Sequence, residues 1–155
     1  MHRLVQLATQ DWPRADSHFE RWGSQFMINL NEAFPDITTD LEDFDLCRSL
    51  LPHVFAAMDI ELHDRNPILR QASVLAKAAL QVHGTGAYAD SRKMYEQALK
   101  IWSELLGPDH IETIRLMQSL GVQYISTQNY ESAESILEET LNQRQDSWET
   151  TIIRR

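Results

Sequence analysis

The chain has 155 residues, which suits one compact domain or a short repeat array. Hydrophobic residues make up 43% of it and charged residues 24%, so a packed core is expected and a disordered chain is excluded. The net charge of −9 argues against nucleic-acid binding, because phosphate recognition requires a basic surface.

The first 35 residues predict one clear helix. The opening segment Met1–Thr9 fits either a helix or a strand, and Pro13 is expected to end it. From Ser17 onward, apolar side chains recur every three or four positions until Pro35, which is typical of a helix with one buried face. Ser17 followed by Glu20 fits a capping box at its start.

A second helical pattern covers residues 46–62, after an acidic stretch. Pro52 lies inside this pattern, and a proline in a helix interior costs about 3 kcal/mol. We therefore expect a kink or break near Leu50 and Leu51, with Pro52 in the first turn of a new helix.

Four further helices are predicted after residue 66, each bounded by turn or capping residues. The first starts with Asn66 as cap and Pro67 in its first position. Gly84-Thr85-Gly86 is expected to end this first helix, and the second begins near Tyr88. Gly107-Pro108 should end the second helix, with the glycine in a left-handed cap. Asp109 with Glu112 forms a capping pair for the third helix, and Asn129 precedes the fourth.

These four helices are two copies of one unit, 42 positions apart. Tyr88 corresponds to Tyr130, and the same offset relates further residues: Ser91 to Ala133, Tyr95 to Leu137, Leu99 to Leu141, Ala79 to Gly121 and Leu80 to Val122. Small residues are expected where the helices of a pair approach closely, and the aromatic after each turn should pack against the first helix. A fixed period of helix pairs is typical of a solenoid.

The repeated segments resemble tetratricopeptide units, with Gly86-Ala87-Tyr88, Ser91, Tyr95 and Ala98 in one copy and Asn129-Tyr130, Ala133 and Leu137 in the next. The segment Leu106–His110, followed by Glu112-Thr113, resembles the inter-repeat turn of the kinesin-light-chain-like subclass. The resemblance covers roughly residues 67–145. It implies an α-solenoid that binds other proteins.

The N-terminal half resembles a stretch of fungal and bacterial NB-ARC–tetratricopeptide proteins, which are STAND-type ATPases. The residues that carry this resemblance are His2-Arg3-Leu4-Val5-Gln6, Trp22, Phe34-Pro35, Cys47 and Leu51-Pro52-His53. It implies a piece or a relative of a longer signalling protein. The chain has no glycine-rich phosphate loop ending in Gly-Lys-Ser/Thr, so ATPase activity is not carried over.

No catalytic or metal site is predicted, and no cofactor. The six histidines form no His-x-x-x-His pair, and one cysteine permits no internal disulfide. Cys47 and His53 are too far apart along a helix to form a nucleophile pair, so Cys47 is expected to be buried. His110 is expected to bond the backbone near a helix start. No membrane span or secretory signal is visible, so we expect a cytoplasmic protein that does not bind a membrane.

Candidate binding residues follow from the resemblance, since the first helix of each tetratricopeptide pair lines the concave groove. The candidates are Lys77, Leu80, His83, Arg115, Gln118 and Val122. They mix apolar and cationic groups and could take a peptide with acidic side chains. The alternative is that Leu80 and Val122 pack one repeat on the next.

Two features outside this groove leave alternatives open. The acidic residues Glu131, Glu134 and Glu138 share one stripe, interpreted as a solvated surface or as a docking patch. The 42-residue register predicts a further turn at 148–152, but the sequence there lacks the Gly-Pro-Asp-His core. We therefore expect an unfinished array that exposes some of Ile136, Leu137 and Leu141 and self-associates.

The sequence thus predicts an all-α chain in three parts: an N-terminal helical linker or capping region (1–66), two tetratricopeptide-like repeats (67–145) and a tail (146–155). The predicted function is a non-enzymatic protein-interaction scaffold, a fragment or relative of a STAND-type protein without its nucleotide-binding domain. The alternative is a kinesin-light-chain-like cargo adaptor.

Overall fold

The computed structural model describes residues 17–35 and 41–153, and this part of the chain is all-α, as predicted. Predictions that fall on residues 1–16, 36–40 or 154–155, such as the Met1–Thr9 segment, lie outside the described residues. Six helices are present in the described part: α2 (Ser17–Ala33), α3 (Leu41–Met58), α4 (Arg65–Gly84), α5 (Tyr88–Leu105), α6 (Ile111–Ser126) and α7 (Tyr130–Ile153).

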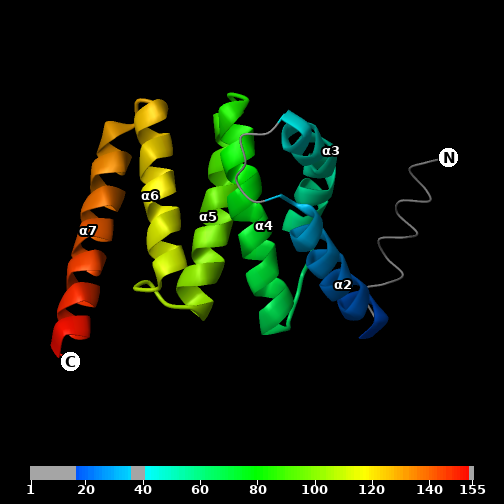
Figure 1. Ribbon diagram of the computed structural model, residues 1–155, viewed down its shortest axis with the longest axis horizontal. Helices are drawn as coiled ribbons and strands as arrows, with labels where there is room; N and C mark the ends of the chain where they lie inside the picture. The colour runs from blue at the N-terminus through cyan, green and yellow to red at the C-terminus, as the bar shows by residue number, and fades with distance from the viewer. Residues whose placement is uncertain (1–16, 36–40, 154–155) are drawn as a thin grey trace.

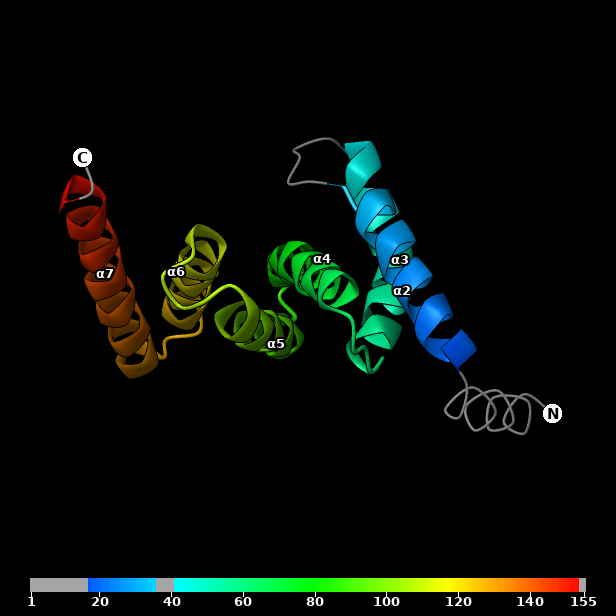
Figure 2. The ribbon, with the colours of Figure 1, turned by 90° about the horizontal axis from the view of Figure 1, so that it is seen from below.

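The helices α4 to α7 lie side by side in chain order, and α2 and α3 lie together at the α4 end (Figure 1). Seen from below, α4 and α5 form one pair and α6 and α7 form the next (Figure 2). The most extensive packing is within these two pairs, α5 joins them by packing on α6, and both α2 and α3 pack on α4. This arrangement confirms the two predicted helix pairs.

The helix α3 corrects the expected break at Pro52. It runs without interruption from Leu41 to Met58 and holds Pro52 in its interior. Val54 and Ala57, both fully buried, follow the proline on the core side of the helix. Their packing outweighs the local cost, and Pro52 itself is exposed, so water can reach the carbonyl that it leaves without a donor.

The start of α4 also differs from the prediction. The cap position is Asp64, whose backbone is extended, and Asn66 and Pro67 lie inside the first turn. The N–H groups of a first helical turn have no intrahelical partner, so Pro67 is tolerated at the third position as readily as at the first.

The predicted turns are confirmed and are equivalent between the repeats. Gly86 and Gly107 have positive φ angles of 84° and 97°, the conformation that glycine adopts most easily. Gln128, 42 positions after Gly86, has a φ of 59°. The second repeat therefore uses a left-handed residue at the same place, but with a side chain that strains it.

Replacing Gln128 by glycine is expected to raise the free energy of unfolding by about 0.5–1 kcal/mol, because glycine removes the left-handed strain. Urea unfolding followed by circular dichroism measures the change. Gln128→Ala is the matched control: it shortens the side chain, keeps the strain and should bring no gain. Equal stability of the alanine and glycine variants would contradict this explanation.

Close approach within each pair depends on small residues, as predicted. In the first pair, the Ser91 hydroxyl of α5 donates to the Ala79 carbonyl of α4 at 2.7 Å. In the second pair, a Cβ built on Gly121 would lie 2.7 Å from Leu137 Cδ2. A side chain at position 121 would therefore push α7 away from α6.

The two tyrosines after the turns both begin the second helix of a pair, so they are equivalent as predicted. Tyr88 contacts the first helix, since its ring meets the edge of His83 at a centroid distance of 5.1 Å. Tyr130 is 63% exposed, so the expected packing of this aromatic against the first helix is wrong for the second repeat.

Polar clamps attach α3 to the first repeat. The Gln71 amide of α4 donates to the carbonyls of Ala57 at 2.6 Å and Ile60 at 3.3 Å. The Gln97 amide of α5 donates to the Met58 carbonyl at 3.0 Å. These bonds satisfy carbonyls at the α3 C-terminus, which have no intrahelical donor.

Candidate peptide-binding face

The six candidate residues lie on α4 and α6, the first helices of the two pairs. On α6, Arg115 and Val122 are exposed and Gln118 is partly buried. The three candidates on α4, which are Lys77, Leu80 and His83, are all partly buried. The α6 part is therefore the more accessible of the two.

The exposed stripe on α6 is longer than the sequence suggested. Ile111 and Ile125 are 55% and 46% exposed, and Val122 is 58% exposed. With Arg115 and Gln118 they are spaced alternately by four and three positions, so they follow one side of the helix. We call Ile111, Arg115, Gln118, Val122 and Ile125 the α6 stripe. The same spacing in the sequence could have identified both isoleucines.

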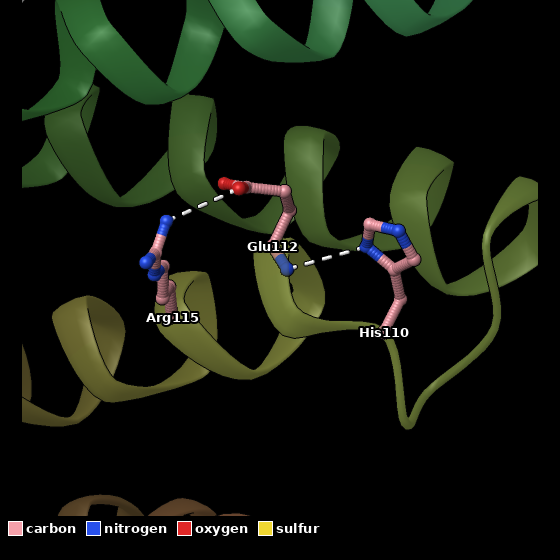
Figure 3. A network of polar contacts seen from close by, with 3 residues as sticks. All are labelled: His110, Glu112 and Arg115. Carbon is pink, nitrogen blue, oxygen red and sulfur yellow. Dashed lines mark hydrogen bonds and ion pairs between the residues drawn. The ribbon is translucent and has the colours of Figure 1, made fainter.

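Arg115 is held at the start of α6 by its neighbours (Figure 3). Its guanidinium lies 3.2 Å from the Glu112 carboxylate, and the Glu112 N–H donates to His110 Nδ1 at 3.2 Å. His110 is the N-cap, which confirms its predicted bond to the backbone and corrects the expected capping by Asp109. The ion pair is solvent-exposed, so Arg115 can exchange Glu112 for an acidic group of a partner at little cost.

His83 differs from the other candidates, because its Nδ1 atom is buried and has no hydrogen-bond partner among the described residues. Its ring packs against Tyr88, and Leu80 contributes partly buried apolar surface one turn earlier. The three α4 candidates thus present less exposed surface than the α6 stripe.

The helices α5 and α6 meet through two tyrosines. Burial raises the pKa of Tyr95 to about 12 from the ordinary 10.0, and a hydrogen bond with the Ser119 side chain lowers it in part. The Tyr124 hydroxyl donates to the Glu96 carboxylate at 3.3 Å. Burial raises the pKa of Tyr124, and the negative charge of Glu96 raises it further. Both phenols therefore stay protonated at neutral pH and join the two repeats.

The raised pKa of Tyr95 predicts a loss of stability at alkaline pH. The unfolded chain ionises this phenol above its ordinary pKa of 10.0, whereas the folded chain keeps the proton until the pKa of about 12. Stability is complete below pH 10 and falls by on the order of 2 kcal/mol as the pH rises towards 12. Urea unfolding of wild type and Tyr95→Phe across this range measures the difference. A parallel fall in both proteins would contradict the assignment to Tyr95.

Other chemistry receives no support in the described residues. No group of three or more His, Cys, Asp or Glu side chains is placed to hold a metal ion in residues 17–35 and 41–153. Cys47 is buried, as expected, whereas His53 is exposed and lies against Phe26. Within these residues, no helix is long and apolar enough to cross a membrane.

Stacked antiparallel helix pairs that repeat every 42 residues define an α-solenoid, in which each unit buries its apolar face on its neighbours. Comparison with known proteins gives the family: residues 70–146 match the tetratricopeptide repeat and belong to that family. This fold is a non-catalytic protein-interaction fold. The predicted fold class and the resemblance to tetratricopeptide units are thereby confirmed.

One similar protein is a "Nucleotide-binding leucine-rich repeat (NLR)-like protein" of the fungus Hyaloscypha variabilis. It is 26% identical over 117 residues, which cover 76% of this chain. The chain spans only 12% of the length of that relative. The chain thus resembles a short part of a much longer fungal protein.

Proposed function

We propose that the chain is a protein-interaction scaffold that binds an acidic amphipathic helix along the α6 stripe. The observation that carries this proposal is the exposure of Ile111, Val122 and Ile125 in one line with Arg115. Apolar anchors spaced by three and four positions fit the apolar face of a helix. The cation selects a partner with an acidic group near one end of that face.

The α4 candidates extend this surface in the proposal. The helices α4 and α6 both pack on α5, and the tetratricopeptide family uses the first helix of each pair for its concave face. Lys77 would add a second cation, and Leu80 and His83 would add apolar contact. The partner therefore interacts with the two repeats together.

Charge reversal at Arg115 is expected to lower the affinity for such a peptide roughly tenfold, because an attractive charge pair becomes a repulsive one. The probe is a labelled acidic peptide selected on the wild-type chain from a library of amphipathic helices. Fluorescence anisotropy measures its affinity for wild type, Arg115→Glu and Lys77→Glu.

The control is Lys100→Glu, which reverses an exposed charge on α5 and should leave the affinity unchanged. Circular dichroism checks that every variant keeps its helicity. Selected peptides without acidic residues, or equal affinities for wild type and Arg115→Glu, would contradict the proposed surface.

We further propose that the chain is a fragment or relative of a STAND-type signalling protein and carries a repeat part without the nucleotide-binding domain. The similarity to the NLR-like fungal protein supports this origin. A sequence encoding a phosphate loop, in frame and upstream of Met1 in the gene, would support this origin. The adaptor of kinesin-light-chain type remains an alternative prediction, which pull-down of a motor subunit by the chain would test.

A further inference from the structure

The side of α7 next to its contact with α6 carries a second line of side chains with coiled-coil spacing. Tyr130, Glu134, Leu137, Leu141 and Arg144 follow one another at intervals of four, three, four and three positions. We call these residues the α7 seam. Tyr130 and Leu141 are 63% and 64% exposed, and Glu134 and Arg144 are also exposed. In the described part of the chain, α7 packs mainly on α6, and the exposed residues of the seam lie beside this contact.

Leu137 anchors the seam to the rest of the protein. Its side chain fills the space above Gly121, where even a Cβ atom would come within 2.8 Å of Leu137 Cγ. It is therefore only partly exposed, and it fixes the rotation of α7 about its axis. Leu141, one turn later, is presented to solvent by this anchoring.

The seam is complementary to itself about position 139, with leucine opposite leucine and glutamate opposite arginine. With a two-fold axis at position 139, residues equally far on either side lie opposite each other in an antiparallel pair of α7 helices. Two positions out, Leu137 faces Leu141 of the other copy. Five positions out, the Glu134 carboxylate faces the Arg144 guanidinium. In a two-fold interface, each of these contacts occurs twice.

Within the described residues, neither Glu134 nor Arg144 forms an ion pair of its own, so both are available to a second copy. A parallel pair would instead place like charges together.

We propose that two copies of this chain associate through the α7 seam as an antiparallel, two-fold symmetric helix pair. Leu137 and Leu141 supply the apolar contact, and Glu134 and Arg144 supply complementary charges that fix direction and register. The occupant of this exposed face is a second copy, because the seam is complementary to itself. This proposal is independent of peptide binding on the α6 stripe.

The experiment exchanges the two charges. Sedimentation equilibrium of the full chain over a range of micromolar concentrations should show a monomer–dimer equilibrium for wild type. Glu134→Arg and Arg144→Glu should each weaken it roughly tenfold or more, since both copies of the ion pair become repulsive. The double variant should restore wild-type affinity, because its pairs are attractive again with their signs reversed.

Mixing the two single variants provides a second test of the same charge pairs. In a heterodimer of Glu134→Arg with Arg144→Glu, an arginine faces a glutamate at both contacts, so the mixture should dimerise more strongly than either variant alone. Glu139→Arg is the control, because Glu139 is exposed on the opposite side of α7. This control should dimerise like wild type.

Three results would overturn the proposal. One is a wild-type chain that stays monomeric over the whole range. Another is a dimer that both single variants leave unchanged, since its interface would then lie elsewhere. The third is a double variant that fails to recover association while circular dichroism shows native helicity.

Discussion

Leu75→Ala is expected to lower the free energy of unfolding by about 2–5 kcal/mol, because it removes a large apolar side chain from the centre of the core. Leu75 is fully buried on α4, the helix that packs on α2, α3 and α5. The cavity would therefore open in the part of the core that joins the N-terminal helices to the first repeat. Denaturant unfolding monitored by circular dichroism measures the loss.

The matched control is the same substitution at an exposed site. Leu141 is 64% exposed, so Leu141→Ala should change the stability of the monomer by less than about 0.5 kcal/mol. Both variants should be measured at low protein concentration, where association does not contribute. Similar losses for the two would show that burial at position 75 does not have the assigned energetic role.

Bulk introduced at Gly121 should also be strongly destabilising. A Cβ at this position would lie 2.7 Å from Leu137 Cδ2, 2.8 Å from Leu137 Cγ and 3.3 Å from Ile136 Cγ2. Gly121→Val is expected to cost about 3 kcal/mol, and Gly121→Ala less, because alanine regains about 0.5–1 kcal/mol of helix propensity. Thermal or urea unfolding of both variants tests whether valine lowers the free energy of unfolding more than alanine does.

Two controls isolate the steric cause. Gly84→Ala, at a glycine with open space around it, should be neutral or slightly stabilising. In a Leu137→Ala background, Gly121→Ala should cost clearly less than in wild type, because the clashing atoms are absent. An unchanged cost in that background would place the strain elsewhere.

The helix pairs could be predicted from the sequence because their signals are local and occur twice. The offset between Tyr88 and Tyr130 identifies equivalent helices, and Gly107 marks the turn between the pairs. The site helices could be predicted for the same reason. The spacing of the candidates extends to Ile111 and Ile125, but how exposed each residue is depends on the neighbouring helices.

The errors arise where tertiary contacts or small differences in backbone geometry decide. Pro52 predicts a break from its local cost alone, but buried residues on the next turn keep α3 continuous. At the start of α6, Asp109 and His110 both have side chains that can accept a backbone N–H. Because the backbone at His110 is extended, with φ −69° and ψ 139°, His110 is the N-cap residue.

The clamps made by Gln71 and Gln97 determine the register of α3 on the first repeat. Apolar side chains on packed helices would tolerate a slip by one turn, because one methyl group can replace another. A slip would move the amide of Gln71 away from the carbonyls of Ala57 and Ile60 and break both hydrogen bonds. The two glutamines thus favour a single alignment of a largely apolar contact.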